Sequence, residues 1–121
     1  MTGSNATVLV VDDDPSLRTL SRVLLELEGF SVREAASLEE AESALAEERP
    51  AVVLLDVHLG SAASDPLFDR LRADGIPVAA VTGSADTAGY AGRADATLMK
   101  PFEPAALVGL ARRLAGRVDD A

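Results

Sequence analysis

The sequence contains no cysteine and a single histidine, His58, among 121 residues. The absence of cysteine excludes disulfides, thiolate catalysis and cysteine-based zinc sites. One histidine cannot supply a metal site built from several imidazoles. No apolar run approaches the ~20 residues that a membrane-spanning helix needs. Residues 1–5 do not carry the basic and apolar segments of a secretory signal. We therefore expect a cytoplasmic protein without a membrane partner.

Basic residues are also scarce, with 11 Lys and Arg against 20 Asp and Glu, for a formal net charge of −9. A surface this negative repels phosphate backbones, so the composition disfavours a nucleic-acid partner and favours a cation or a basic protein surface. Hydrophobic residues make up 48% of the chain, which is enough for a packed core. The length predicts one domain over residues 1–121, with its core at about residues 6–117.

Short apolar runs alternate with longer amphipathic stretches, which is typical of a parallel sheet flanked by helices. Each predicted strand is a short apolar run, and together the runs cover 6–11, 30–35, 51–55, 77–81 and 94–99. Each predicted helix opens at a capping residue or a proline, and these openings lie at Pro15, after Ser37, at Asp65-Pro66, at Ser84 and at Glu103-Pro104. The pattern predicts an α/β fold with a five-fold βα alternation.

Local signals add detail to this outline. Asp14 is a helix cap before Pro15, and Ser37 with Glu40 forms a predicted capping box. Residues 60–64 are small and predict a loop. The first helix is predicted to turn one stripe of leucines toward the sheet, namely Leu17, Leu20, Leu24 and Leu27.

Polar residues follow the predicted strands where the apolar runs stop. Asp12 and Asp13 follow the first strand and Asp56 the third, while Thr82 and Lys100 follow the fourth and fifth. Ligands of an open α/β sheet bind at the carboxyl ends of its strands, so we expect these side chains to converge. Three carboxylates at one edge would repel each other unless a cation joined them, and sulfur-free oxygen ligands favour Mg²⁺.

A site of this composition is suited to a phosphoryl group. Mg²⁺ and Lys100 can neutralise the phosphoryl oxygens, and Thr82 can donate a hydrogen bond to them. An aspartate can itself act as the nucleophile, which gives an acyl phosphate. The residues therefore predict phosphoryl transfer to a carboxylate.

Four motifs occur in order along the chain: VLVVDDDP at 8–15, VVLLDV at 52–57, VTG at 81–83 and MKPF at 99–102. Together they resemble the receiver domain of two-component response regulators, in particular the chemotaxis-type single-domain regulators, over about residues 6–117. The resemblance implies a doubly wound sheet of five parallel strands, (βα)5, in the flavodoxin-like order 2-1-3-4-5.

The resemblance also implies a ligand set and a donor. Asp56 would accept a phosphoryl group from a histidine kinase or a histidine phosphotransfer protein. Asp13 and Asp56 would ligate Mg²⁺ directly, and Asp12 would do so through water. The backbone carbonyl of His58 would be a further metal ligand.

The same resemblance implies a switch. Lys100 would pair with the phosphoryl group, and Thr82 would move toward it and alter a surface that binds an unidentified downstream protein. The Lys100-Pro101 bond would be cis. The resemblance leaves dimerisation of the chain open.

One departure from the family pattern keeps alternatives open. Thr97 lies three positions before Lys100, where the family usually has an aromatic residue that moves with the threonine. The chain could then be a phosphate relay or sink, or the receiver of a hybrid histidine kinase. From another class, it could be a metal-dependent aspartyl phosphohydrolase, although His58 stands where such enzymes carry a second acid. We expect a phosphoacceptor signalling domain rather than an enzyme.

Overall fold

The fold is built on a parallel sheet whose strands follow the apolar runs of the sequence. A computed structural model describes residues 6–59, 62–63, 65–83 and 94–119. The sheet has five strands, and they lie in the order β2-β1-β3-β6-β7. Their bounds are Thr7–Val11 (β1), Ser31–Ala35 (β2), Val52–Asp56 (β3), Val78–Thr82 (β6) and Ala96–Met99 (β7). Counted along the chain, this is the predicted order 2-1-3-4-5, so the doubly wound α/β fold is confirmed.

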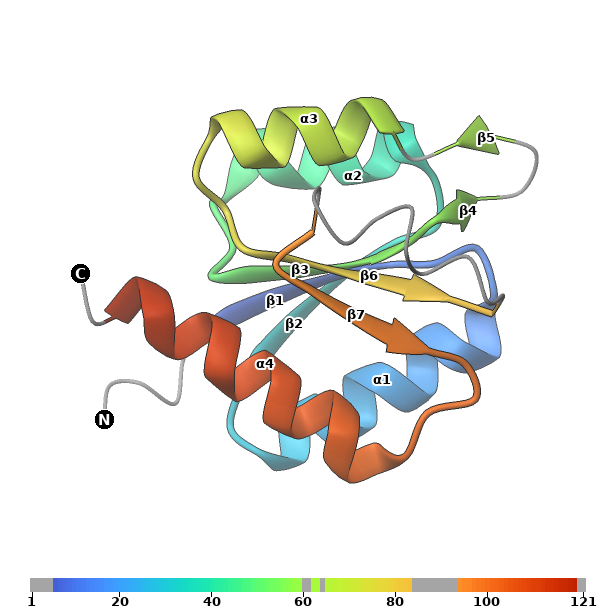
Figure 1. Cartoon of the computed structure of the whole chain (residues 1–121), viewed down its shortest axis with the longest axis vertical. Helices are drawn as coiled ribbons and strands as arrows, with labels where there is room; N and C mark the ends of the chain where they lie inside the picture. The colour runs from blue at the N-terminus through green and yellow to red at the C-terminus, as the bar shows by residue number, and fades with distance from the viewer. Residues whose placement is uncertain (1–5, 60–61, 64, 84–93, 120–121) are drawn as a thin grey trace.

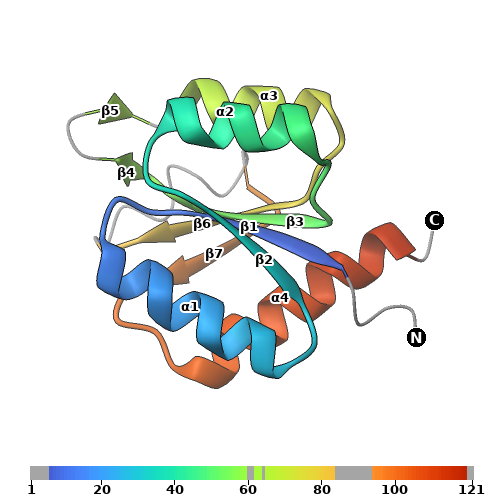
Figure 2. The same cartoon turned by 180° about the vertical axis from the view of Figure 1, so that it is seen from behind.

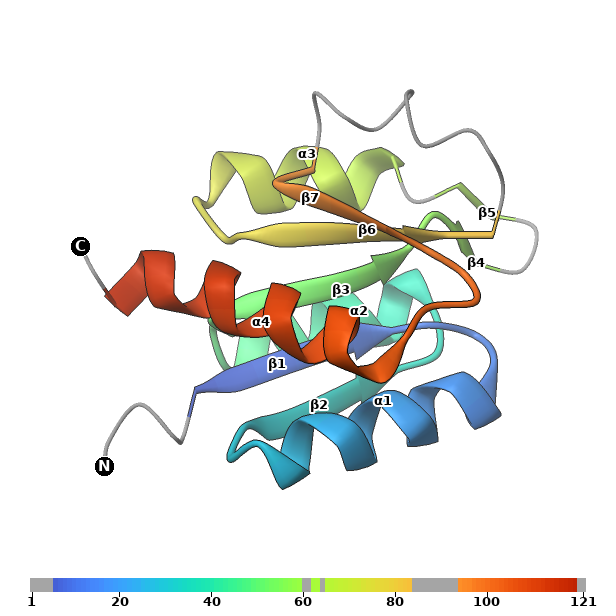
Figure 3. The ribbon, with the colours of Figure 1, turned by 60° about the horizontal axis from the view of Figure 1, so that its bottom comes forward.

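Helices cover both faces of this sheet. Those in the described ranges are Pro15–Leu27 (α1), Leu38–Glu47 (α2), Asp65–Ala73 (α3) and Pro104–Asp119 (α4). Helices α1 and α4 lie on one face, and α2 and α3 lie on the other (Figures 1 and 2). In Figure 3 the face that carries α1 and α4 is turned toward the viewer. The helix predicted to open at Ser84 falls outside the described residues. No helix among those described is both long and apolar enough to cross a bilayer.

A small antiparallel pair follows β3, and its second strand lies within the loop predicted at residues 60–64. Strand β4 spans His58–Leu59 and β5 spans Ala62–Ala63. His58 pairs with Ala63 and Leu59 with Ala62. Two-residue strands are too short to produce a periodic pattern, which explains why the sequence did not indicate them.

The core consists of two layers, one on each face of the sheet. Alternate residues of a strand point to opposite faces. Thus Leu9 and Val11 of β1 pack with the α2 and α3 layer, whereas Val8 and Val10 pack with the α1 and α4 layer. Both sides of the central strands are therefore buried, which accounts for their uninterrupted apolar sequences.

Helix α1 turns a different face inward from the predicted leucine stripe. Leu20 is 46% exposed and Leu27 is 77% exposed, whereas Ser21 and Leu25 are buried. Ser21 and Leu25 are separated by one turn, so they mark the centre of the inward face. Leu20 and Leu27 lie about a third of a turn or more from that centre at ~100° per residue, and the prediction for them was wrong.

The predicted helix caps are present, with one difference. The Asp14 carboxylate accepts a hydrogen bond from the Ser16 amide at 3.0 Å, and the Ser37 hydroxyl accepts one from the Glu40 amide at 3.1 Å. The Glu40 carboxylate reaches the amide of Ala36 at 2.8 Å, one residue before the cap. Helix α2 thus begins where the sequence predicts.

Candidate functional site

The carboxyl ends of β1 and β3 bring three aspartates together. The two strands are neighbours, with Val11 opposite Leu55, so the residues that follow also lie side by side. One carboxylate oxygen of each of Asp12, Asp13 and Asp56 lies within 4.8 Å of the others. Asp12 and Asp56 are buried and Asp13 is exposed. The predicted convergence of the three acidic side chains is therefore present in the structure.

Lys100 places a positive charge against this cluster. Its Nζ lies 3.3 Å from Oδ2 of Asp12 and 3.4 Å from Oδ2 of Asp56. Burial lowers the pKa of the Lys100 ammonium, but the nearby charges of Asp56 and Asp12 outweigh it, so its pKa is raised above the usual value. The lysine therefore stays protonated at neutral pH.

A backbone hydrogen bond joins Thr82 to Lys100. Thr82 ends β6 and is buried, and its carbonyl accepts a hydrogen bond from the Lys100 amide at 2.7 Å. The Lys100-Pro101 bond is cis, as the resemblance implied. A Cβ added to Gly83 would meet no heavy atom within 4 Å, so the backbone beside Thr82 borders open space.

His58 opens β4, two residues after Asp56. No contact of its carbonyl with the acidic cluster is described for the residues that the structure covers, and its role as a ligand stays a prediction.

The donor set of the cluster fits a hard divalent cation. Three carboxylates face one ammonium group, which leaves an excess of negative charge within a space of 4.8 Å. Oxygen atoms on one Mg²⁺ lie up to ~4 Å apart, since each Mg–O distance is ~2.1 Å. Direct ligation by two of the carboxylates and a water bridge to the third therefore suits this spacing.

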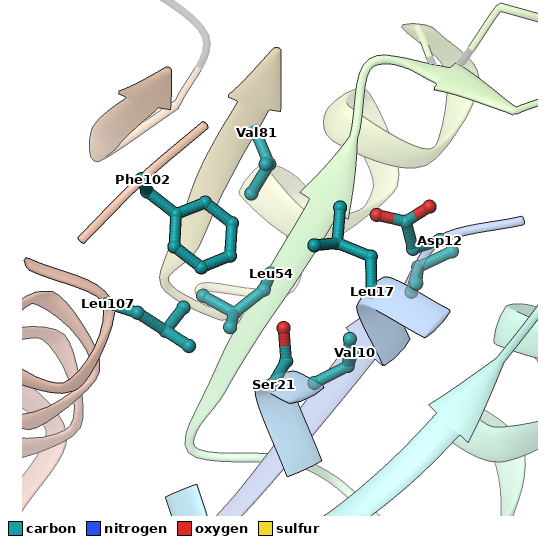
Figure 4. A pocket seen from close by; sticks show the side chains of 9 residues that line it. Val10, Asp12, Leu17, Ser21, Leu54, Val81, Phe102 and Leu107 are labelled. Atoms are coloured by element: carbon teal, nitrogen blue, oxygen red, sulfur yellow. The ribbon is translucent and has the colours of Figure 1, made fainter. Parts of the chain in front are cut away.

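A narrow cavity lies beneath the cluster, on the α1 and α4 side of the sheet. Figure 4 shows the Ser21 hydroxyl pointing into this space from α1, toward Leu54 and Phe102. Asp12 lines the end of the cavity nearest the acidic cluster. Ser21 is 4% exposed, and within the described ranges its hydroxyl makes no hydrogen bond.

Replacing Ser21 by Ala is expected to raise the free energy of unfolding by about 1 kcal/mol. The change removes a buried hydroxyl whose loss of hydration destabilises the folded state, because no hydrogen bond compensates for it. Alanine is also the better helix former. Urea denaturation measures the difference. Ser43→Ala on the exposed side of α2 is the matched control, because it changes helix propensity alone and should gain only ~0.5 kcal/mol. A less stable Ser21→Ala variant would contradict the prediction.

Comparison with known proteins settles the family. The sequence model of the response regulator receiver domain matches residues 8–112. The chain belongs to this family. Receiver domains are signalling domains of two-component systems and are phosphorylated on an aspartate; they are not generally classed as enzymes. Family membership thus confirms the resemblance and disfavours the phosphohydrolase alternative.

Curated relatives of this receiver domain include longer regulators. The DNA-binding response regulator MtrA of Mycobacterium tuberculosis is 38% identical over 118 residues, which cover 93% of this chain and 52% of MtrA. The phosphate regulon transcriptional regulatory protein PhoB of Pseudomonas aeruginosa is 31% identical over 110 residues, covering 84% of this chain and 48% of PhoB. The chain spans about half the length of these relatives. Because MtrA is named as DNA-binding, these relatives give no support to the expected absence of a nucleic-acid partner.

Solved structures of single receiver domains superpose on nearly the whole chain. The CheY-like receiver domain protein of Methanospirillum hungatei has a TM-score of 0.86 and 26% identity, and the match covers 97% of this chain and 99% of that one. The chemotaxis response regulator CheY4 of Vibrio cholerae has a TM-score of 0.80 and 27% identity, with coverages of 91% and 98%. These neighbours confirm the flavodoxin-like architecture of the receiver domain.

Proposed function

We propose that this receiver domain accepts a phosphoryl group on Asp56 from a phosphohistidine donor, with Mg²⁺ held by Asp12, Asp13 and Asp56. One observation carries the proposal: three carboxylates and the Lys100 ammonium converge at the carboxyl ends of the two central strands. The donor would be a histidine kinase or a histidine phosphotransfer protein. We further propose that residues 1–121 form one domain, with its core at about residues 6–117.

The surroundings of the three carboxylates favour Asp56 as the nucleophile. Oδ1 of Asp12 accepts a hydrogen bond from the Asp14 amide at 2.9 Å, which ties this carboxylate to the loop after β1. Asp13 lies on the exposed loop after β1. Asp56 ends the buried strand β3, where the rigid sheet fixes its position. A nucleophile held on a rigid strand meets the donor in a constant geometry.

The transfer exchanges one phosphorus bond for another. An Asp56 carboxylate oxygen attacks the phosphorus of phosphohistidine, an O–P bond forms, the N–P bond breaks, and the electron pair returns to the imidazole nitrogen. Lys100 neutralises negative charge on the phosphoryl oxygens as they enter. Mg²⁺ held by Asp12, Asp13 and Asp56 would supply further charge neutralisation. The His58 carbonyl would complete the metal ligands on the β3 side.

The product would change a surface through Thr82 and Lys100. The Lys100 amide donates to the Thr82 carbonyl, so the backbones of the two residues are linked directly. Phosphorylation adds negative charge, which attracts the Lys100 ammonium and offers the Thr82 hydroxyl an acceptor. A shift of these residues would alter the edge of the sheet at β6 and β7 and with it the binding of a downstream protein.

A phosphate relay or sink is the second candidate function, and Thr97 favours it. Thr97 is an exposed residue of β7, at the position where an aromatic side chain would otherwise follow Thr82. Without that side chain, phosphorylation of Asp56 would change the proposed protein-binding surface less. Transfer of the phosphoryl group from the labelled domain back to a histidine phosphotransfer protein would distinguish a relay from a switch.

Acetyl phosphate with Mg²⁺ is expected to add one phosphoryl group to the purified chain, because the site supplies both the nucleophile and charge neutralisation. Intact-protein mass measures the adduct. The adduct should survive acid and be lost in base, as an acyl phosphate is, and EDTA should prevent its formation. No adduct with Mg²⁺, or an adduct that forms equally well in EDTA, would overturn the proposed function.

A further inference from the structure

An arginine on α1 forms a hydrogen bond with the backbone of one residue of the acidic cluster. Nη1 of Arg18 donates a hydrogen bond to the backbone carbonyl of Asp12 at 2.8 Å. Nε of the same guanidinium donates to the Glu34 carboxylate on β2 at 3.2 Å. The Arg18 side chain is only 19% exposed. We propose that Arg18 is a positioning residue that fixes Asp12 for Mg²⁺ binding, an inference that rests on the proposed function.

Asp12 needs such support because it is the first residue beyond β1. Its amide continues the ladder to β2 by donating to the Ala35 carbonyl at 3.0 Å. Its carbonyl lies past the last β1–β3 register pair, Val11 with Leu55, and accepts from Arg18 instead. Arg18 therefore binds the Asp12 carbonyl just beyond the point where the pairing of β1 with β3 ends. Its bond to the carbonyl limits rotation of the peptide that joins Asp12 to Asp13.

Arg18 is itself held by a charged network. Nη1 of Arg22 donates to the second oxygen of Glu34 at 2.8 Å, so one carboxylate binds two arginines. The hydrogen bond from Arg22 lowers the pKa of Glu34, and the bond from Arg18 adds to it against the opposing effect of burial. Glu34 is therefore ionised at neutral pH and keeps the Arg18 fork oriented toward Asp12.

The geometry of the guanidinium matters more here than its charge. Arginine offers donors on Nη1 and Nε in fixed directions, and lysine offers one compact ammonium that cannot reproduce both bonds. Removing the charge of Arg18 would by itself favour a cation at the nearby carboxylates. Losing the fixed position of Asp12 would act in the opposite direction. Arg18→Lys keeps the charge and so isolates the effect of position.

Calorimetric titration of the unphosphorylated chain with Mg²⁺ tests the proposal. Arg18→Lys is expected to weaken Mg²⁺ binding about tenfold, the lower end of the effect of outer-shell partners on metal affinity. Arg18→Gln should lose less Mg²⁺ affinity at low salt, because removing a positive charge near the site favours the cation and offsets part of the loss. At high salt this charge effect is screened, so the Mg²⁺ affinity of Arg18→Gln should approach that of Arg18→Lys. Labelling by acetyl phosphate should need correspondingly more Mg²⁺ for half its maximal rate.

Arg22→Lys is the matched control. Arg22 lies one turn further along α1 and binds the same glutamate, but it makes no described contact with Asp12. Its replacement should leave Mg²⁺ affinity within about twofold of the wild type, because the bond to the Asp12 carbonyl remains. Urea denaturation without Mg²⁺ confirms that each variant is folded.

The outcomes separate the inference from the proposed function. Wild-type affinity in Arg18→Lys would overturn the positioning role while leaving Mg²⁺ binding intact. An equal loss in Arg22→Lys would also overturn it, since the effect would then belong to the charged network as a whole. If the wild-type chain binds no Mg²⁺, the proposed function fails and the positioning role fails with it.

Discussion

Asp56→Asn is expected to abolish phosphoryl uptake from acetyl phosphate. The carboxamide has no anionic oxygen to attack phosphorus, and neither Asp12 nor Asp13 is placed to replace it. Asparagine has nearly the same shape as aspartate, so the buried end of β3 should keep its packing. Lys100 would retain Asp12 as a partner. The measurement is intact-protein mass after incubation with acetyl phosphate and Mg²⁺.

Asp14→Asn is the matched control for this experiment. It removes one negative charge from the loop after β1, and asparagine caps a helix about as well as aspartate. We expect its labelling to match the wild type. Persistent labelling of Asp56→Asn would place the acceptor on another carboxylate, and peptide mapping of the adduct would then identify it.

The sheet and the acidic cluster could be predicted because both depend on short-range signals. Strands buried on both faces require continuous apolar sequence, and each of the central runs ends at a polar residue. Parallel strands bring their carboxyl ends to one edge, which predicts that Asp12, Asp13 and Asp56 lie at the same edge, and the pairing of β1 with β3 brings them close together. The order of the strands came instead from the resemblance, since periodicity does not say which strands are neighbours.

The orientation of α1 could not be predicted from its leucines. Apolar side chains are spread around more than half of this helix, so several faces are consistent with the periodicity. The structure turns the small Ser21 toward the sheet and leaves Leu20 and Leu27 exposed. Ser21 lines a cavity together with Phe102 and Leu54, and such a cavity is a property of the packed structure that helix periodicity does not show.

Arg18 was missed for a related reason. No local motif links an arginine in the second turn of a helix to a backbone carbonyl before that helix. Its second partner, Glu34, lies on the next strand, and only the pairing of β1 with β2 brings it close. Arg18 and Arg22 lie on the same helix, and nothing in the sequence indicates that Arg18 rather than Arg22 contacts the site.

Asp13→Asn is expected to change stability and Mg²⁺ binding in opposite directions. Three carboxylates within 4.8 Å repel each other. Asparagine removes one negative charge from this cluster and keeps a side chain of the same shape that can still form hydrogen bonds, while Lys100 keeps its ion pairs with Asp12 and Asp56. The free energy of unfolding without Mg²⁺ should rise by about 0.5–1 kcal/mol, since Asp13 is exposed and solvent screens its charge. Mg²⁺ affinity should fall at least ~10-fold, because a proposed direct ligand is lost.

Urea denaturation at increasing Mg²⁺ concentration reveals both effects in one series. A ligand that binds the folded state stabilises it according to its concentration relative to its dissociation constant. The variant should therefore be the more stable protein without Mg²⁺, and the wild type should overtake it as Mg²⁺ is added. Asp14→Asn should gain stability from Mg²⁺ as the wild type does. Parallel curves for Asp13→Asn and the wild type would show that Asp13 does not ligate the metal, whereas a loss of stability without Mg²⁺ would contradict the predicted relief of repulsion.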